Sequence, residues 1–183
     1  MTAPPLEAPA DLSLRALVLP GYAQMLHALA GQLDKAAQCP GAATFFSARL
    51  APDMQPLSAQ VRFVCLQAEE ARARLLDQPI AQVAPVADFA DAQDRLAWAR
   101  ARVSEAAADP APVDPRRRIT LTLADGLVFD LSVADYVRSW AIPQFYFHLV
   151  TAYALLRHAG APIGKADYVP HMAAFAKPRG EST

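Results

Sequence analysis

The chain has 183 residues, of which 54% are hydrophobic and 19% are charged, and its formal net charge is −1 at pH 7. This length and apolar content predict one domain over residues 1–183, built around one sizeable core. The balanced charge lacks the basic excess of most nucleic-acid-binding proteins, so no nucleic-acid partner is expected. We see neither a signal peptide nor the roughly 20 consecutive apolar residues that span a bilayer. A cytoplasmic protein without a membrane partner is therefore expected.

Residues 1–17 are rich in proline and alanine and predict an N-terminal arm. Apolar residues then recur at helical spacing between proline, glycine and aspartate breakers. This pattern predicts three long helices, over about residues 20–39, 56–78 and 88–109. The third is expected to begin at Asp88, whose side chain is suited to cap it.

After residue 117 the spacing of apolar residues changes from the helical period to strict alternation. Two runs of alternating apolar and polar residues flank Asp125-Gly126, which predicts a β-hairpin over about residues 118–131. Ser132 and Asp135 form a capping pattern that starts a further helix. Pro143 is expected either to kink that helix or to begin a new one, which then ends at Gly160. Residues 169–183 show no clear periodicity and predict a flexible tail. The elements together predict a mainly all-α four-helix bundle with one inserted hairpin.

The chain has four histidines, and no two of them share the three- or four-residue spacing that places a pair of metal ligands on one helix face. His148 lies beside the apolar seam of the last helix. Two interpretations stay open for it. It is either a histidine that makes a hydrogen bond at the core boundary, or a ligand or general acid–base whose pKa lies near neutrality.

A second group of polar residues surrounds a proline turn. Arg49 and Asp53 bracket this turn, and either they form a salt bridge that orders the loop, or they face a pocket between the second and last helices. Gln60 in the second helix and Tyr153 in the last helix are the other candidates for this pocket. The chain contains no glycine-rich phosphate loop, nucleophile elbow or paired-histidine zinc motif. The candidate pocket predicts a small-molecule ligand, and the sequence does not indicate which reaction, if any, the protein catalyses.

Three segments in order resemble the DUF1993 family, a domain of unknown function in the DinB/YfiT-like superfamily of metalloenzyme-type bundles. They are Ala-Arg-Leu-Ala-Pro-Asp-Met at residues 48–54, the run from Pro143 to His158, and Gly-Lys-x-Asp-Tyr at residues 164–168. The resemblance implies an up-and-down four-helix bundle that is commonly a dimer. In metal-binding members three histidines hold a divalent ion, one from the second helix and two spaced H-x-x-x-H on the last helix. Activities in the superfamily include thiol-dependent transferases and isomerases.

This chain departs from the three-histidine pattern. Ala152 stands where a second histidine would follow His148, and the second helix has no histidine, with Gln60 as its nearest polar candidate. A zinc or nickel cofactor would therefore have an incomplete triad, with His148 as the one candidate ligand. The sequence predicts an enzyme with an altered or lost metal site or, alternatively, a non-catalytic small-molecule-binding or structural bundle. The resemblance and the low charge content both favour a homodimer.

Overall fold

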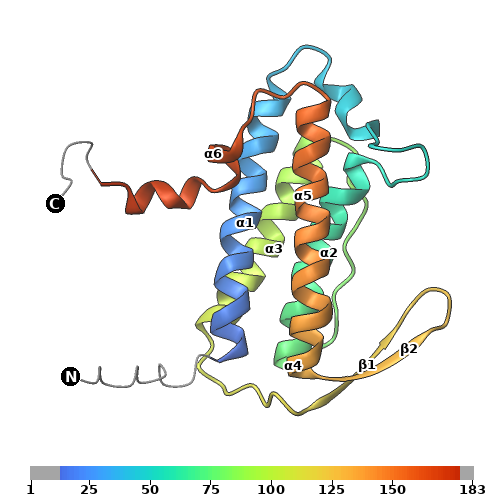
Figure 1. Cartoon of the computed structure of the whole chain (residues 1–183), viewed down its shortest axis with the longest axis vertical. Coiled ribbons are helices and arrows are strands. Elements are labelled where there is room, and N and C mark those ends of the chain that lie inside the picture. Colours follow the sequence, from blue (N-terminus) through green and yellow to red (C-terminus); the bar gives the residue numbers. More distant parts are fainter. Residues whose placement is uncertain (1–12, 178–183) are drawn as a thin grey trace, which may run out of the picture.

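The computed structural model describes residues 13–177, and the predicted four-helix bundle with an inserted hairpin is confirmed (Figure 1). The long helices are α1 (Leu14–Ala37), α2 (Leu57–Leu76), α3 (Phe89–Ala108) and α5 (Ile142–His158). The hairpin consists of β1 (Arg118–Thr122) and β2 (Val128–Ser132). Shorter helices are η1 (Ala42–Ser47), α4 (Val133–Tyr136), α6 (Lys165–Tyr168) and η3 (Pro170–Phe175).

The first helix begins earlier than the sequence indicates. Ser13 caps α1 by accepting a hydrogen bond from the backbone N–H of Ala16 at 3.2 Å, so residues 14–17 are helical rather than part of an arm. Pro20 lies inside α1, on its solvent-exposed side. The remainder of the predicted arm, residues 1–12, lies outside the described residues.

The connection between α2 and α3 sets the direction of the helices. Residues 77–88 run back along α2, where Arg62 Nε donates to the carbonyl of Val83 at 2.9 Å. As a result α3 starts beside the beginning of α2, and the two helices run parallel. Both run antiparallel to α1 and α5 (Figure 1). The bundle is thus not a strict alternation of up and down helices.

The predicted hairpin is present, with Arg118 paired to Ser132 and Thr122 paired to Val128. Gly126 in the turn has a φ of 87°, which favours glycine. Ile119 and Leu121 are buried, and Arg74 of α2 donates a hydrogen bond to the carbonyl of Thr120 at 3.0 Å. A two-stranded sheet is marginal alone, so these contacts with the end of α2 support it.

The helix passes Pro143 without ending. A π-helical segment, Val137–Ala141, joins α4 to α5 and directly precedes the first turn of α5, where Pro143 lies. Proline has no N–H to donate to the preceding turn, and a widened π turn accommodates that missing hydrogen bond. This continuity carries His148 along the face of α5 that packs on α2.

Aromatic stacking joins α1 to α5 in the core. The rings of Tyr22 and Phe145 lie parallel, with centroids 3.8 Å apart and an interplanar angle of 10°. Tyr146 meets both rings edge to face. In the tail, residues 170–175 form the short helix η3, and residues 178–183 lie outside the described part. No helix in residues 13–177 has the length and apolar content needed to cross a membrane.

Replacing Phe145 with alanine should lower the free energy of unfolding by about 3–5 kcal/mol, because it removes a fully buried ring and leaves a cavity. Leu127→Ala is the control, since Leu127 is also a large apolar residue but lies beside the hairpin turn and is 52% exposed. The control should change the free energy by about 0.5 kcal/mol or less. Urea denaturation of both variants checks this, and equal losses would contradict the packing of α5 described above.

Candidate functional site

Helices α2 and α5 bring two of the predicted site residues together. His148 Nδ1 lies 2.8 Å from Gln60 Oε1. Gln60 is buried and His148 is half-buried, and their contact joins α2 to α5. The first turn of α2 and the central turns of α5 therefore supply the one pair among the predicted residues that is in direct contact.

The hydrogen bonds of Gln60 define the tautomer of His148. Gln60 Nε2 donates to the backbone carbonyl of Gln55 at 3.3 Å. A carbonyl only accepts, so the amide nitrogen must face Gln55 and the amide oxygen must face the imidazole. His148 Nδ1 is then the protonated nitrogen that donates to Gln60. Nε2 keeps its lone pair and makes no hydrogen bond to the described residues.

The surroundings of His148 are apolar. Its ring centroid lies 4.9 Å from that of Phe63 on α2 and 5.2 Å from that of Phe147 on α5. Burial among these groups lowers the pKa of His148 to about 4. The imidazole is therefore neutral at pH 7. A neutral imidazole with a free Nε2 can accept a hydrogen bond, but a group with so low a pKa is a weak general base.

The other predicted residues lie elsewhere. Arg49 is exposed and donates to the backbone carbonyl of Met54. Asp53 is also exposed, and no ion pair joins it to Arg49 within residues 13–177. Tyr153 packs edge to face on Tyr168, with centroids 5.7 Å apart. The structure thus joins Gln60 to His148 by a hydrogen bond, and within residues 13–177 Arg49, Asp53 and Tyr153 make no hydrogen bond to this pair.

The residues at this position do not fit a divalent metal ion. Ala152, one turn beyond His148, is fully buried and offers no ligand atom. Gln60 offers an amide oxygen that is already bonded to the imidazole. Across residues 13–177, no group of three or more His, Cys, Asp or Glu side chains is placed to hold a metal ion. A zinc or nickel site needs at least three such donors, so the expected incomplete triad is not completed by residues from other helices.

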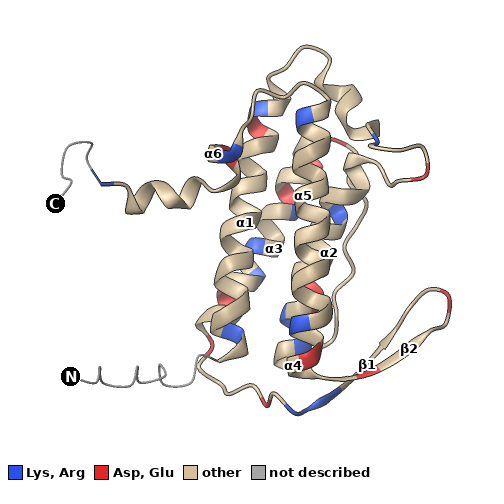
Figure 2. Cartoon of the chain, viewed as in Figure 1, with Lys and Arg blue, Asp and Glu red and all other residues tan. Residues whose placement is uncertain are grey.

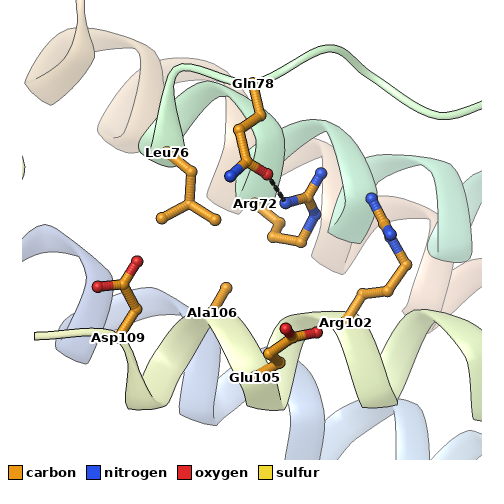
Figure 3. Close-up of a pocket in the computed structure, with 7 residues that line it drawn as sticks. All are labelled: Arg72, Leu76, Gln78, Arg102, Glu105, Ala106 and Asp109. Atoms are coloured by element: carbon orange, nitrogen blue, oxygen red, sulfur yellow. Dashed lines mark hydrogen bonds between the residues drawn. The ribbon is translucent and has the colours of Figure 1, made fainter. Parts of the chain in front are cut away.

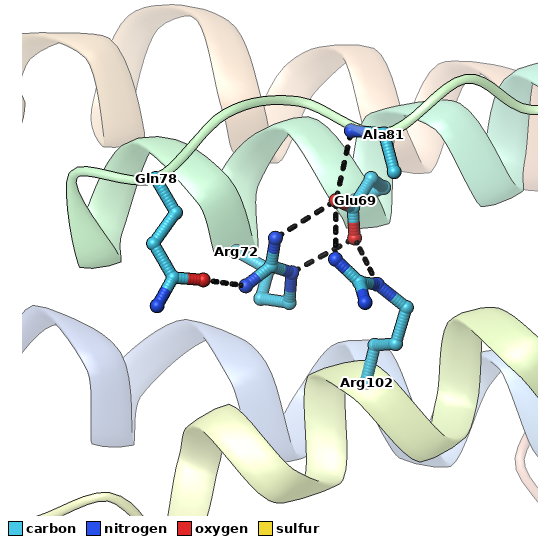
Figure 4. A network of polar contacts seen from close by, with 5 residues as sticks. All are labelled: Glu69, Arg72, Gln78, Ala81 and Arg102. Carbon is cyan, nitrogen blue, oxygen red and sulfur yellow. Dashed lines mark hydrogen bonds and ion pairs between the residues drawn. The ribbon is translucent and has the colours of Figure 1, made fainter.

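A second polar cluster, which the sequence analysis did not single out, lies between α2 and α3. Glu69 is 0% exposed and accepts hydrogen bonds from two guanidinium groups and one backbone N–H (Figure 4). Arg72 donates through Nε and Nη2 at 2.8 Å each, and Arg102 of α3 donates through the same two atoms at 2.9 Å each. The N–H of Ala81, in the segment that returns along α2, donates at 3.1 Å. We call these four residues the Glu69 cluster.

The Glu69 cluster keeps its carboxylate ionised. Burial by itself would raise the pKa of Glu69, but the hydrogen bonds from Arg72, Arg102 and Ala81 outweigh it and lower the pKa to about 2. Two guanidinium groups surround one carboxylate, so the cluster has a formal charge of +1. Arg72 also donates to Gln78 Oε1 at 2.6 Å, which fixes the start of the returning segment.

The Glu69 cluster borders a cleft of about 340 Å³ at the ends of α2 and α3 (Figure 3). We call it the α2–α3 cleft. Arg72 and Arg102 lie toward one end, and Asp109 lies at the other, with Leu76 and Ala106 between them. Gln78 and Glu105 complete the lining. The lining of the cleft therefore contains both positively charged and negatively charged side chains.

The sequence gives one signal for this buried cluster. Glu69 and Arg72 lie three residues apart, which is the spacing of an ion pair on one helix face, and small Ala68, Ala71 and Ala73 lie beside them. Small side chains allow a neighbouring helix to approach closely, and charged residues that such a helix buries must be paired.

The sequence profile of a family described as a domain of unknown function, DUF1993, matches residues 14–169. The chain belongs to the DUF1993 family. The crystal structure of a DinB family member from Shewanella denitrificans is similar to this DUF1993 protein, with a TM-score of 0.69 and 24% sequence identity. The match covers 93% of this chain and 96% of that one, and it shows a shared fold. No curated protein matches the sequence.

His148 of this DUF1993 protein should be the Nδ1-protonated tautomer at pH 7 and should titrate near pH 4. The folded-state pKa lies below the ordinary value of 6.5, so unfolding takes up a proton between these values. The free energy of unfolding should therefore fall as the pH drops from 6.5 toward 4. Nitrogen-15 NMR of the imidazole checks the tautomer and the pKa.

Gln60→Leu is the control, because it removes the acceptor of the Nδ1 proton and should release the tautomer preference. A doubly protonated His148 at pH 6 in the parent protein would contradict the description of the pair.

Proposed function

We propose that this protein is a small-molecule-binding helical bundle that works without a metal ion, and that its ligand occupies the α2–α3 cleft. The observation that carries the proposal is the guanidinium group of Arg102. Its Nε and Nη2 are bonded to Glu69, whereas Nη1 makes no hydrogen bond to any described residue. A fixed, charged donor at the edge of a cleft is a group that commonly orients a ligand.

The size and rigidity of the cleft support the same function. A volume of about 340 Å³ is at the lower end of the range for small-ligand sites. Arg102 is held by two hydrogen bonds to a buried carboxylate, so little side-chain entropy would be lost when a ligand binds. The cleft is therefore organised before a ligand arrives.

Binding is favoured over catalysis by the properties of His148. A general base works best when its pKa lies near the working pH, and the pKa of His148 is about 4. Within residues 13–177, the other candidates Arg49, Asp53 and Tyr153 make no hydrogen bond to His148. The alternative, an enzyme with an altered metal site, would need a set of reactive groups around His148 Nε2. We therefore assign His148 and Gln60 the role of joining α2 to α5.

Trp98 offers a direct test of the α2–α3 cleft, because Arg102 Cζ lies 5.2 Å from the centre of its ring. The chain has two tryptophans, so Trp140→Phe leaves Trp98 as the sole reporter. Titration with pentanoate, pentylamine, 5-aminopentanoate and inorganic phosphate should change the Trp98 fluorescence for at least one probe. Arg102→Gln should weaken that response about tenfold or more, because the ligand loses a charged hydrogen bond.

Arg102→Lys is the matched variant, since it keeps the charge and loses the planar set of donors. Circular dichroism confirms that each variant is folded. No response to any probe, or a response that Arg102→Gln leaves unchanged, would reject the α2–α3 cleft as the binding site.

We also propose that the protein is a homodimer that associates through the outer face of α1 and α5. No Asp, Glu, Lys or Arg occurs at residues 16–33 or 139–156, and Figure 2 shows these helices uncharged along their middle. Leu17, Phe147 and Val150 are large apolar side chains exposed on these two helices. Helix η3 extends away from the bundle and adds exposed Met172 and Phe175 (Figure 1). A second copy would cover these apolar groups.

Val150→Glu should convert the dimer to a monomer, because each interface would then bury two extra charges without partners. Ala101→Glu, at an exposed position of α3, should leave the dimer intact. Size-exclusion chromatography with light scattering measures the mass of each variant. A monomeric parent protein, or a dimeric Val150→Glu variant, would contradict this interface.

A further inference from the structure

We infer that the protein has a second ligand site, which binds a small organic anion through a carboxylate or phosphate group. The site is a pocket of about 440 Å³ that contains Arg49, and we call it the Arg49 pocket. Its volume lies within the range of small-ligand sites. Ser58 lines this pocket and Arg72 lines the α2–α3 cleft. These residues are fourteen positions apart on α2, or about 21 Å along the helix axis, so the two sites are separate.

Three segments that are distant in the sequence form the Arg49 pocket. Helix η1 contributes Phe46 and Ser47, and the loop that follows it contributes Arg49. The first turn of α2 contributes Ser58, and the segment that returns along α2 contributes Val86. Figure 1 shows η1 and its loop at the end of the bundle opposite the hairpin. The pocket therefore lies where the returning segment meets the start of α2.

The lining of the Arg49 pocket is positively charged. Arg49 is its one charged side chain in the described part of the chain. Nη1 of Arg49 donates to the backbone carbonyl of Met54, whereas Nε and Nη2 make no hydrogen bond within residues 13–177. Asp88 and Asp91, which follow the returning segment, accept hydrogen bonds from backbone N–H groups at the start of α3. A guanidinium with free N–H groups and no carboxylate partner suits the oxygens of a carboxylate or phosphate.

The rest of the lining offers a hydroxyl group and apolar surface. Ser58 is half-buried, and its hydroxyl makes no hydrogen bond to the described residues, so it can donate to the anion. Phe46 and Val86 are each 6% exposed. Phe46 is held edge to face against Phe89 of α3, with ring centroids 4.6 Å apart. An anionic group attached to an apolar body can therefore contact both kinds of surface.

The loop that carries Arg49 is closed before a ligand binds. At its base the N–H of Leu57 donates to the carbonyl of Ala48 at 3.1 Å. Arg49 then joins the two sides of the loop through its bond to the carbonyl of Met54. Part of the guanidinium is thus already held, which reduces the side-chain entropy lost when an anion binds.

Benzoate, phenyl phosphate and benzyl alcohol test the inference, because they share an aromatic ring and differ in charge. Amide NMR titration of the full chain locates where each probe binds. We expect both anions to shift the signals of residues 43–49, 57–58 and 86–87, and benzyl alcohol to bind about tenfold more weakly or less. The anion that binds more tightly identifies the preferred group as a carboxylate or a phosphate. Arg49→Gln should weaken both anions about tenfold or more, because the charged hydrogen bonds are lost.

Arg116→Gln is the matched control, since Arg116 is also an exposed loop arginine and does not line the Arg49 pocket. It should leave the binding of both anions unchanged. Ser58→Ala keeps the contact between Arg49 and Met54, and it should weaken the anions by about two- to tenfold.

The inference is independent of the proposed function, so Arg102→Gln should leave the signals of the Arg49 pocket responsive to both anions. The Arg49 pocket is overturned as an anion site if neither anion shifts these signals, or if benzyl alcohol binds as tightly as benzoate. Unchanged binding of the anions by the Arg49→Gln variant would overturn it as well. None of these results depends on what binds in the α2–α3 cleft.

Discussion

The fold depends on how one buried carboxylate is compensated. Glu69 is fully enclosed, and an unpaired charge in such a position would cost several kcal/mol. Its partners come from three places, namely Arg72 on the same helix, Arg102 on α3 and the backbone of Ala81 in the returning segment. These contacts hold residues 77–88 against α2. They thereby favour the parallel arrangement of α2 and α3 over the simple alternation that short connections produce.

Most of the architecture could be predicted from local patterns. Helical spacing of apolar residues located the four long helices, and the alternation around Asp125-Gly126 located the hairpin. The direction of α3 could not be predicted in this way, because periodicity records which face of a helix is buried and not where the preceding segment runs. The start of α1 was missed because the predicted helix was begun at residue 20, whereas Ser13 caps it. At Pro143 a π-helical segment replaces the expected kink or break.

The sequence predicted the residues of one polar site and missed those of the other. Gln60 and His148 were both candidates, and their contact follows from the antiparallel packing of α2 and α5. The sequence also showed that Ala152 could not supply a ligand. What it could not show was that the Gln60 amide would bind His148 Nδ1 and leave the imidazole neutral. Glu69 and Arg72 were missed because the apolar period of the second helix locates its apolar face and does not record which of its charged side chains another helix covers.

The Gln60–His148 pair and the Glu69 cluster connect α2 to different helices. The Gln60–His148 pair joins α2 to α5. The Glu69 cluster joins α2 to α3 and borders the α2–α3 cleft (Figures 3 and 4). Arg102 has a role in both the fold and the proposed function, because its contacts with Glu69 orient the N–H groups that face the cleft.

A double-mutant cycle between Glu69 and Arg102 tests this account most directly. The free energies of unfolding of the parent, Glu69→Gln, Arg102→Gln and the double variant would be measured by urea denaturation at pH 7. Because the two side chains share two hydrogen bonds at 2.9 Å, we predict a coupling energy of about 1–3 kcal/mol. Additive effects of the two substitutions would contradict the claim that this pair holds α3 against α2.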